Sequence, residues 1–479
     1  MLKEIKLPDN VQEWWEQNSS IIRRVGEQVL GKTSGKGPPE EETWWWNEDV
    51  QKEIKVKKEA KKRLDMTGSQ EDKAAYKLAN KMAKRAVVQA KAKAVSEAYE
   101  DIERKDGERK LMRIAKARDK VSKDFTSIKQ IKGEDGEVIR DQDKIRHRWK
   151  GYFKKLLNKE NARTLWEDGE PNEGVIVEVS RKEVEYTIRK MKNGKAVGVD
   201  EIPVEVWRSL GEDGIDIVWD LMDKLWMQET IPEEWRKSIL VLVFKGKGDI
   251  QECGNYRGIK LMPHTMKIWE RIIEGRLRQE TSIGDKQFGF MPERGTTDVI
   301  FALRQLMEHY REMQTELHMV FIDLEKAYDR VPRQEVWRCM REKGVPEKYV
   351  RLVKEMYEGA VTQVRSSVGM TEGFSMEVGL HQGSALSPYL FDFVTDVLVR
   401  DVTCEAPWSM LFADDIVLCE TSRDRLELKL EEWRKALEER GMKISRAKTE
   451  YMISKDQEDI FIRLQGGMLP TVQKFKYLT

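Results

Sequence analysis

Residues 411–420 read LFADDIVLCE, with two adjacent aspartates, Asp414 and Asp415, between two apolar runs. Short apolar runs separated by two polar residues predict a β-hairpin, and Asp is a common turn residue. Two carboxylates beside apolar walls also repel each other and lose hydration, so they shift their pKa or bind a cation. The stretch alone leaves two interpretations open, an ordinary turn and a metal site at a hairpin tip.

A second stretch, HMVFIDLEKAYDRVP at residues 318–332, favours the metal site. Its apolar run predicts a strand, Met319–Asp323, which delivers Asp323 at its end. If this strand and the hairpin are neighbours in one sheet, three carboxylates surround one point. Mg²⁺ prefers oxygen ligands from a few acidic groups together with substrate phosphates. Two such ions can activate an attacking hydroxyl and stabilise the leaving oxygen of a phosphoryl displacement.

The composition describes a globular chain without a strong overall charge. Of its 479 residues 39% are hydrophobic and 36% are charged, and the net charge is only +1, so any nucleic-acid signal must be local. The four cysteines are scattered without a C-x-x-C pair, which fits a reducing intracellular setting. No stretch approaches the ~18 apolar residues of a membrane span, so we expect a soluble intracellular protein without a membrane partner.

The N-terminal third divides into two expected parts. Residues 1–44 are expected to be a polar, flexible leader. Within it, Gly26–Thr33 matches the phosphate-loop pattern G-x-x-x-x-G-K-[ST], but the prolines that follow cannot start the helix this motif needs, so we interpret the match as chance. Residues 45–180 are expected to form a basic helical extension, because Ala, Lys and Glu dominate its first half. Its basic faces either follow a phosphate backbone or are simply solvated: Lys57, Lys58, Lys61, Lys62, Lys81, Lys84 and Arg85.

From residue 180 onward, strand and helix patterns alternate. We expect further strands at Ile239–Phe244, Met410–Ala413 and Ile416–Cys419. The segment Leu426–Leu437 spaces its apolar residues as a helix that packs on one face, and Gly441 ends it.

These stretches resemble the reverse transcriptases encoded by non-LTR (LINE-type) retrotransposons, most closely those of RTE-like elements. FIDLEKAYDRVP resembles motif A, VGLHQGSALSPYLF motif B and GMKISRAKTEYM motif D, and FADD stands where the [F/Y]-x-D-D box of motif C is expected. Upstream, NGKAVGVDEIPVE, IPEEWRKSILVLVFKGKGD, CGNYRGIKL and FGFMPERGTTDVIF resemble the fingers motifs in their usual order. One F-x-D-D box would be weak, whereas eight ordered blocks are specific. A group II intron maturase shares the palm but fits the WWWNEDV and NGKAVGVDEIP blocks less well.

The resemblance implies an α+β fold with the fingers and palm of a right-hand polymerase. The palm would be an antiparallel sheet with flanking helices, preceded by the long helical N-terminal extension. Residues 181–318 would be mainly fingers and residues 319–479 palm, ending at the start of the primer grip. We expect this sequence to lack the endonuclease and the thumb of full-length elements.

The implied activity is RNA-directed DNA synthesis, the transfer of a nucleotide from a dNTP to a primer 3′-hydroxyl. The implied partners are an RNA template and a DNA primer, and the implied cofactor is a pair of Mg²⁺ ions, with Mn²⁺ as a substitute. Asp323 and Asp414 would be the main catalytic ligands of both ions, with Asp415 more peripheral. Nuclear action is implied by the family only. The alternative is a catalytically inactive nucleic-acid-binding remnant of a truncated element.

The resemblance also implies contacts to the incoming nucleotide. Lys245 and Arg257 match fingers positions that clasp the β- and γ-phosphates. Tyr328 matches an aromatic residue under the sugar, where a ring excludes a ribose 2′-hydroxyl, although such a residue alone would more often be core. Gln382 and Gly383 fall where the family packs the nascent base pair.

Three basic residues are further candidates. Lys448 in motif D would lie near the leaving pyrophosphate and supply a proton, with a merely solvated lysine as the alternative. Lys195 and Arg294 are candidates for phosphate contacts with the template or the primer.

Overall fold

The computed structural model describes residues 8–31, 46–67, 69–100, 130–454 and 461–475. The chain divides into two compact units, one of residues 1–25 with 128–479 and one of residues 26–127. Among the helices of these described ranges, none has the length and apolar character needed to cross a membrane.

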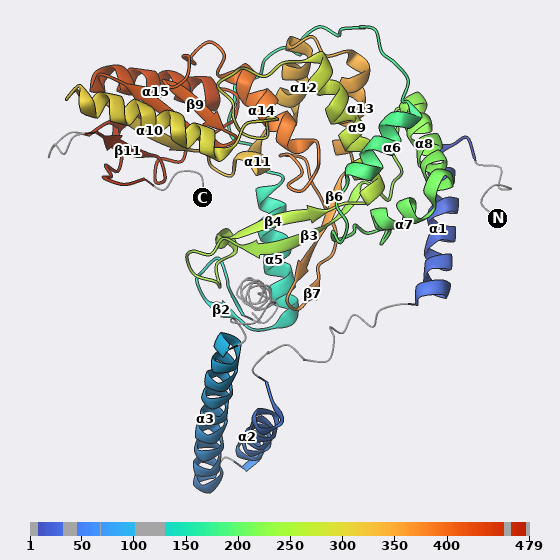
Figure 1. The fold of residues 1–479 in the computed structure, drawn as a ribbon, viewed down its shortest axis with the longest axis vertical. Helices are drawn as coiled ribbons and strands as arrows, with labels where there is room; N and C mark the ends of the chain where they lie inside the picture. Colours follow the sequence, from blue (N-terminus) through green and yellow to red (C-terminus); the bar gives the residue numbers. More distant parts are fainter. Residues whose placement is uncertain (1–7, 32–45, 68, 101–129, 455–460, 476–479) are drawn as a thin grey trace. The chain divides into compact units, whose positions relative to one another are not determined.

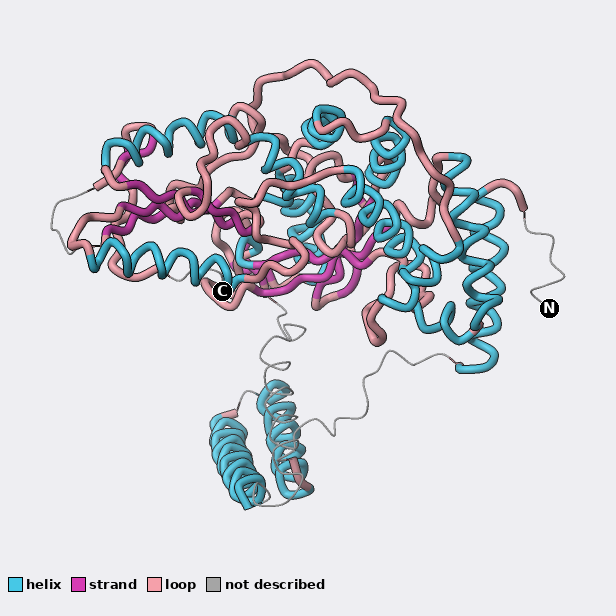
Figure 2. The backbone as a smooth tube through the Cα atoms, turned by 45° about the horizontal axis from the view of Figure 1, so that its top comes forward, coloured by secondary structure: helices cyan, strands magenta, loops and turns pink. Residues whose placement is uncertain are grey.

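The unit of residues 26–127 contains two long helices, α2 (Glu48–Thr67) and α3 (Gln70–Glu100), which lie side by side (Figure 2). Small buried side chains, among them Ala60 and Ala83, allow the close approach of the two helices. The predicted basic side chains of these helices are exposed or half-buried. The helical extension is shorter than the expected range 45–180, because residues 128–180 belong to the other unit.

The prediction that residues 1–44 form a flexible leader is wrong for α1 (Val11–Leu30). This helix packs into the core of the larger unit. Trp14 and Trp15 are fully buried there, and their indole nitrogens donate to Asp220 Oδ2 at 2.6 Å and to Glu234 Oε2 at 2.7 Å. The signal was a helical spacing of apolar residues inside a polar stretch. The end of α1 overlaps the phosphate-loop-like pattern, so its first five residues are helical, and the rest of the pattern apart from Gly31 lies outside the described residues.

A four-stranded antiparallel sheet, here called the palm sheet, has the strand order β11-β5-β10-β9. Its edge strands β9 and β11 are labelled in Figure 1. Its strands are β5 (His318–Asp323), β9 (Ser409–Phe412), β10 (Asp415–Glu420) and β11 (Glu450–Ile453). Alternate residues of β5 face two different cores: Val320 and Ile322 join the main core of the unit, and Met319 and Phe321 join a smaller core with α10 (Thr296–Glu312). The sheet is therefore covered on both faces, as the nearly unbroken apolar run of β5 requires.

A second sheet, here called the fingers sheet, has the order β4-β3-β6-β7, with β8 also paired to β6. Its strands are β3 (Lys237–Phe244), β4 (Tyr256–Leu261), β6 (Val361–Ser366), β7 (Gly369–Met370) and β8 (Phe374–Ser375). The chain range expected to be palm thus contributes three strands to this other sheet. β3 and β6 are parallel neighbours, which only a long connection can supply.

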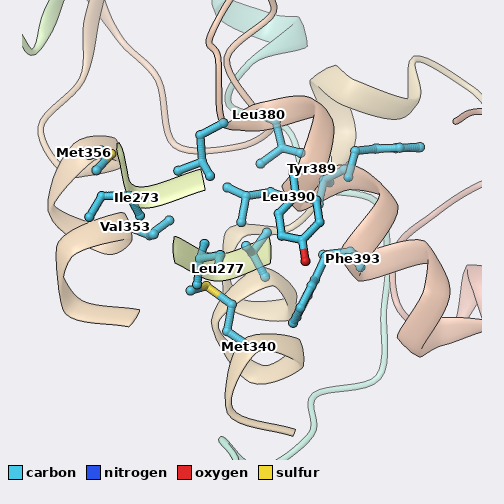
Figure 3. Packing of buried hydrophobic residues seen from close by; sticks show 14 of the residues in the cluster. Ile273, Leu277, Met340, Val353, Met356, Leu380, Tyr389, Leu390 and Phe393 are labelled. Carbon is cyan, nitrogen blue, oxygen red and sulfur yellow. The ribbon is translucent and has the colours of Figure 1, made fainter. Parts of the chain in front are cut away.

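Helices cover both sheets and pack on one another. The remaining elements are β1 (Ile131–Lys132), β2 (Val138–Ile139), α5 (Gln142–Leu156), α6 (Arg181–Lys190), α7 (Val204–Ser209), α8 (Gly211–Gln228), the short η3 (Cys253–Asn255), α9 (His264–Glu280), α11 (Ala327–Arg330), α12 (Arg333–Glu342), α13 (Glu347–Tyr357), α14 (Ser387–Leu398), α15 (Arg423–Glu438), β12 (Arg463–Leu464) and β13 (Gly467–Met468). Figure 3 shows the core in which α9, α12, α13 and α14 meet. In α15 the four apolar residues that predicted its packed face are all fully buried: Leu426, Leu430, Trp433 and Leu437.

Candidate active site

The two carboxylate-bearing strands are neighbours, as the sequence analysis requires. Asp415 on β10 pairs directly with Asp323 on β5, and on its other side pairs with Phe412 of β9. Only Ala413 and Asp414 remain to form the hairpin turn, so Asp414 lies at the tip beside the Asp415–Asp323 pair. Three aspartates from distant parts of the sequence therefore meet at one end of the palm sheet.

Gln287 holds this turn from outside, and sequence reasoning missed it. Its side-chain Oε1 accepts hydrogen bonds from the backbone N–H of Ala413 at 3.0 Å and of Gly289 at 2.9 Å, and the residue is 2% exposed. A Cβ on Gly289 would lie 2.4 Å from the nitrogen of Ala413, so only glycine permits this approach. Ala413 itself has a φ of +56°, an uncommon conformation for alanine. The two hydrogen bonds that Gln287 accepts, here called the clamp of Gln287, stabilise the strained turn that carries Asp414.

Two of the three carboxyl groups, those of Asp414 and Asp415, have raised pKa values. Burial raises the pKa of Asp414, and the nearby charge of Asp323 raises it further. Burial and then the charges of Asp414 and Asp323 raise the pKa of Asp415 to about 6. Like charges at a half-buried position are stabilised when a cation joins them, so the donor set fits a hard divalent ion.

A lysine pairs with one of these carboxylates. Lys448 Nζ donates to Asp323 Oδ1 at 2.8 Å. In the ranges that the structure describes, no group of three or more His, Cys, Asp or Glu side chains is drawn together closely enough to form a metal site. The ammonium group of Lys448 compensates part of the negative charge at this end of the palm sheet.

Basic side chains converge opposite the aspartates. Lys245 Nζ donates to the carbonyl of Gly254 at 2.8 Å, and Lys326 Nζ reaches the same oxygen at 3.5 Å. Lys326 also donates to Tyr152 Oη at 3.3 Å. Burial first, and then the neighbouring charge of Lys326, lowers the pKa of Lys245 to about 8. Arg257, exposed on β4, adds another positive charge to the same group.

Neither lysine of this pair forms an ion pair with a carboxylate among the described residues, although the charge of Asp329 interacts with both. Sequence reasoning identified Lys245 and Arg257 but missed Lys326. The available signal was its position three residues after Asp323, directly before the short helix α11.

Tyr328 lies beside the aspartates. Its ring stacks on Phe391 with the ring centroids 4.4 Å apart and meets the Phe290 ring edge-on at 6.5 Å. Burial raises the pKa of its hydroxyl, followed by the charges of Asp392 and Asp414. The hydroxyl has no hydrogen-bond partner within the described part of the chain.

The loop after residue 380 is anchored to the fingers sheet. The carbonyl of Gln382 accepts from the backbone N–H of Lys260 at 2.7 Å, and its side chain donates to Asp329 Oδ1 at 2.9 Å. Gly383 has a φ of +109°, and a Cβ there would lie 2.7 Å from the Lys260 carbonyl oxygen. A close approach was expected at Gly383, and the group that approaches it here is the backbone of Lys260.

The two remaining basic candidates differ from each other. Lys195 is exposed at the edge of a cavity. The guanidinium of Arg294 is already engaged: it pairs with Asp285 Oδ1 at 2.7 Å, bonds the Gln287 carbonyl at 2.9 Å and lies over the Phe288 ring. Arg294 thus supports the loop that carries Gln287, and its phosphate contact stays a prediction.

Part of the chain matches a known protein family. Residues 245–479 match the family described as reverse transcriptase (RNA-dependent DNA polymerase). This part of the chain therefore carries a reverse transcriptase domain, a domain of the nucleotidyltransferase class. More particularly, the curated relatives that the chain matches are proteins of non-LTR retrotransposons.

Two relatives illustrate the likeness. The "Transposon TX1 uncharacterized 149 kDa protein" of Xenopus laevis is 25% identical over 349 residues, covering 65% of this chain and 26% of the relative. The "Probable RNA-directed DNA polymerase from transposon X-element" of Drosophila melanogaster is 27% identical over 253 residues, covering 51% of this chain and 27% of the relative. The chain thus spans about a quarter of their length. Among solved structures, an apo telomerase from Candida tropicalis aligns at a TM-score of 0.36 and 13% identity over 55% of this chain and 58% of that chain, which alone does not define a fold.

Proposed function

We propose that this chain is an RNA-directed DNA polymerase of an RTE-like non-LTR retrotransposon. It would add deoxynucleotides to a primer 3′-hydroxyl on an RNA template. The observation that carries this proposal is the pairing of Asp323 with Asp415 beside Asp414, inside a reverse transcriptase domain.

Asp323 and Asp414 would hold two Mg²⁺ ions, with Asp415 supporting the same site. When bound, the ions supply activation of the primer hydroxyl and stabilisation of the leaving oxygen. The aspartates fix where the reacting groups meet, because the strand pairing of β5 and β10 and the clamp of Gln287 leave the turn little freedom. Lys448 would leave Asp323 as the site fills and become free to protonate the departing pyrophosphate.

The cationic cluster would bind the triphosphate. Lys245 and Arg257 approach from the fingers sheet, and Lys326 approaches from the segment that follows β5. An anion between Lys245 and Lys326 removes the repulsion of two neighbouring ammonium groups. Tyr328 would lie under the sugar and exclude a 2′-hydroxyl, supported by its stack on Phe391.

The test is primer extension on an RNA template with Mg²⁺. We expect the wild-type chain to extend the primer, and Asp323→Asn and Asp414→Asn each to lower the rate by at least about a thousandfold, because each removes a ligand that both ions share. Glu325→Gln is the matched control, since this half-exposed acid lies two residues from Asp323 and its carboxylate approaches Lys443, at 3.8 Å.

Extension that survives Asp323→Asn and Asp414→Asn at the level of Glu325→Gln would refute the catalytic roles. A wild-type chain that binds RNA with a steep salt dependence but never extends a primer would instead support the alternative, a catalytically inactive nucleic-acid-binding remnant. Circular dichroism on each variant separates loss of chemistry from loss of fold.

A further inference from the structure

Asp329 is an acid of this domain that lies outside the centre of three aspartates. It is half-buried on α11, and its Oδ1 accepts a hydrogen bond from Gln382 Nε2 at 2.9 Å. The backbone carbonyl of Gln382 accepts from the Lys260 N–H at 2.7 Å. Gln382 is therefore held at two points, at its backbone by β4 and at its side-chain amide by Asp329.

Backbone contacts bring the two segments that carry this pair together. The Leu380 N–H donates to the Tyr328 carbonyl at 2.7 Å. Gly379 has a φ of +82°, and a Cβ there would lie 2.6 Å from the carbonyl oxygen of Asp329, so the approach requires glycine. The hydrogen bond between the two side chains thus forms between backbone segments that already touch.

The surroundings of Asp329 favour its ionised form against burial. Burial raises the pKa of this carboxyl, and three lysine charges together with the hydrogen bond from Gln382 oppose the rise. The three lysines are Lys326, Lys260 and Lys245. Lys260 Nζ is buried and has no hydrogen-bond partner among the residues that the structure describes, and the charge of Asp329 favours its ammonium form. Asp329 therefore supplies a counter-charge to a buried cation.

An ionised carboxylate fixes the orientation of an amide that it contacts. The carboxylate can only accept hydrogen bonds, whereas the amide of Gln382 has one donor end and one acceptor end. Asp329 therefore turns Nε2 toward itself and Oε1 away. In the described ranges Oε1 accepts no hydrogen bond, so it remains to accept one from a nucleotide.

We propose that Asp329 is a positioning residue that promotes selection of the matched nucleotide by holding the Gln382 amide in one orientation. The inference rests on the proposed function, under which Gln382 packs against the nascent base pair. A mismatched pair places its groups differently, and an amide that is fixed cannot turn to follow them. Asp329 acts through Gln382 and contacts no reacting group.

The experiment measures equilibrium binding of a matched and a mismatched dNTP to the chain on a dideoxy-terminated primer with an RNA template. The ratio of the two Kd values is the selectivity, which does not depend on the folded fraction of a variant. We expect Asp329→Asn to lower the selectivity about tenfold, because an asparagine can donate as well as accept and no longer fixes the Gln382 amide. Gln382→Glu should lower it at least as much, since two carboxylates then face each other.

A double variant gives the decisive comparison. Asp329→Asn/Gln382→Glu exchanges the donor and the acceptor, keeps the net charge of the pair and leaves an oxygen directed away from position 329. We expect its selectivity to be at least about tenfold higher than the product of the two single losses predicts. Its urea unfolding midpoint without nucleotide should also exceed that of Gln382→Glu. Glu325→Gln, four residues before Asp329, is the matched control and should retain the wild-type selectivity.

Single losses that simply multiply in the double variant, or wild-type selectivity in Asp329→Asn, would overturn the role of Asp329. An unfolding midpoint of the double variant that falls by the sum of the two single changes would overturn the donor–acceptor pairing itself. A wild-type chain that binds no dNTP would instead contradict the proposed function, and the urea measurement still tests the pair because it needs neither nucleotide nor catalysis.

Discussion

The palm sheet and the fingers sheet bring opposite charges to the same place by different means. The acids of the palm sheet are fixed by strand register, since Asp415 pairs with Asp323 and a two-residue turn holds Asp414. The cations of the fingers side lie at a strand end and on an exposed strand face, as Lys245 and Arg257 show. Strand pairing in the backbone fixes the positions of the acids, whereas the positions of the cationic groups depend on long side chains.

This difference suggests a division of labour. Carboxylates that share ions must be held to fractions of an ångström, and paired strands supply that precision. The ammonium group of lysine and the guanidinium group of arginine lie at the ends of long side chains. They can therefore move with a triphosphate as it binds and dissociates. Changes to the acids should therefore abolish chemistry, and changes to the cations should weaken nucleotide binding by graded amounts.

The largest graded effect is expected at the lysine pair. Lys326→Gln removes one of two ammonium groups that share the Gly254 carbonyl and should raise the KM for dNTP about tenfold with a smaller change in kcat, because a charged hydrogen bond contributes roughly 1.5–3 kcal/mol. Lys326→Arg should retain most of the affinity, and Tyr152→Phe tests the hydroxyl that Lys326 also contacts. A lower kcat with an unchanged KM would place Lys326 in the chemical step instead.

The pH dependence of nucleotide use should reveal Lys245. Its pKa is lowered to about 8, so the ammonium group is charged below that pH and loses its proton above it. We expect kcat/KM for dNTP to fall as the pH rises through about 8, since the triphosphate then meets one charge fewer. In Lys245→Arg, where the charge persists, the fall should move to higher pH. A profile that is identical in both chains would remove Lys245 from the triphosphate site.

The rigidity of the acidic side can be tested at Gln287. Gln287→Leu removes the acceptor of two backbone N–H groups, so the turn that carries Asp414 gains freedom. We expect kcat to fall about fivefold to tenfold with little change in the KM for dNTP, and stability to fall by about 1–3 kcal/mol. Gln287→Glu keeps an oxygen acceptor and should recover part of kcat. Steady-state kinetics and urea unfolding measure the two effects.

The smallest expected effect is a gain in the free energy of unfolding when Asp415 is replaced by asparagine. Asp415 titrates at about 6 in the folded chain and near 4 when unfolded, so without metal the folded chain binds more protons between these values and loses stability as the pH rises through them. Asp415→Asn should remove this loss and stabilise the metal-free chain above about pH 6 by about 1 kcal/mol, after discounting for solvent screening. Urea unfolding in EDTA at two pH values measures it. An equal gain at pH 4 would exclude this origin.

The sequence predicted the elements of the palm well because their signals are local. Apolar runs located β5, β9 and β10 to within two residues, and the ordered motifs placed Asp323 and Asp414 in one centre. The pairing register of these strands could not be predicted from the sequence, because it depends on contacts between segments far apart in the chain. The same is true of the parallel pairing of β3 with β6, which moved residues 361–375 out of the expected palm.

The missed residues share a physical reason. Gln287, Lys326 and Tyr152 are polar residues whose roles exist only once distant segments are packed together, so no local pattern marks them. The leader was misjudged for the opposite reason: Trp14 and Trp15 carried a helical signal, but the polar residues around them dominated the average.

Counting bound ions tests the convergence of the three aspartates most directly. Mn²⁺ would be titrated into the chain with a dideoxy-terminated primer on an RNA template and the matching dNTP, and free Mn²⁺ followed by electron paramagnetic resonance. We predict two bound Mn²⁺ per wild-type chain and loss of this binding in Asp414→Asn, while Glu325→Gln retains both. Undiminished binding in Asp414→Asn, or a wild-type chain that extends primers without binding Mn²⁺ or Mg²⁺, would contradict a shared ion site at Asp323, Asp414 and Asp415.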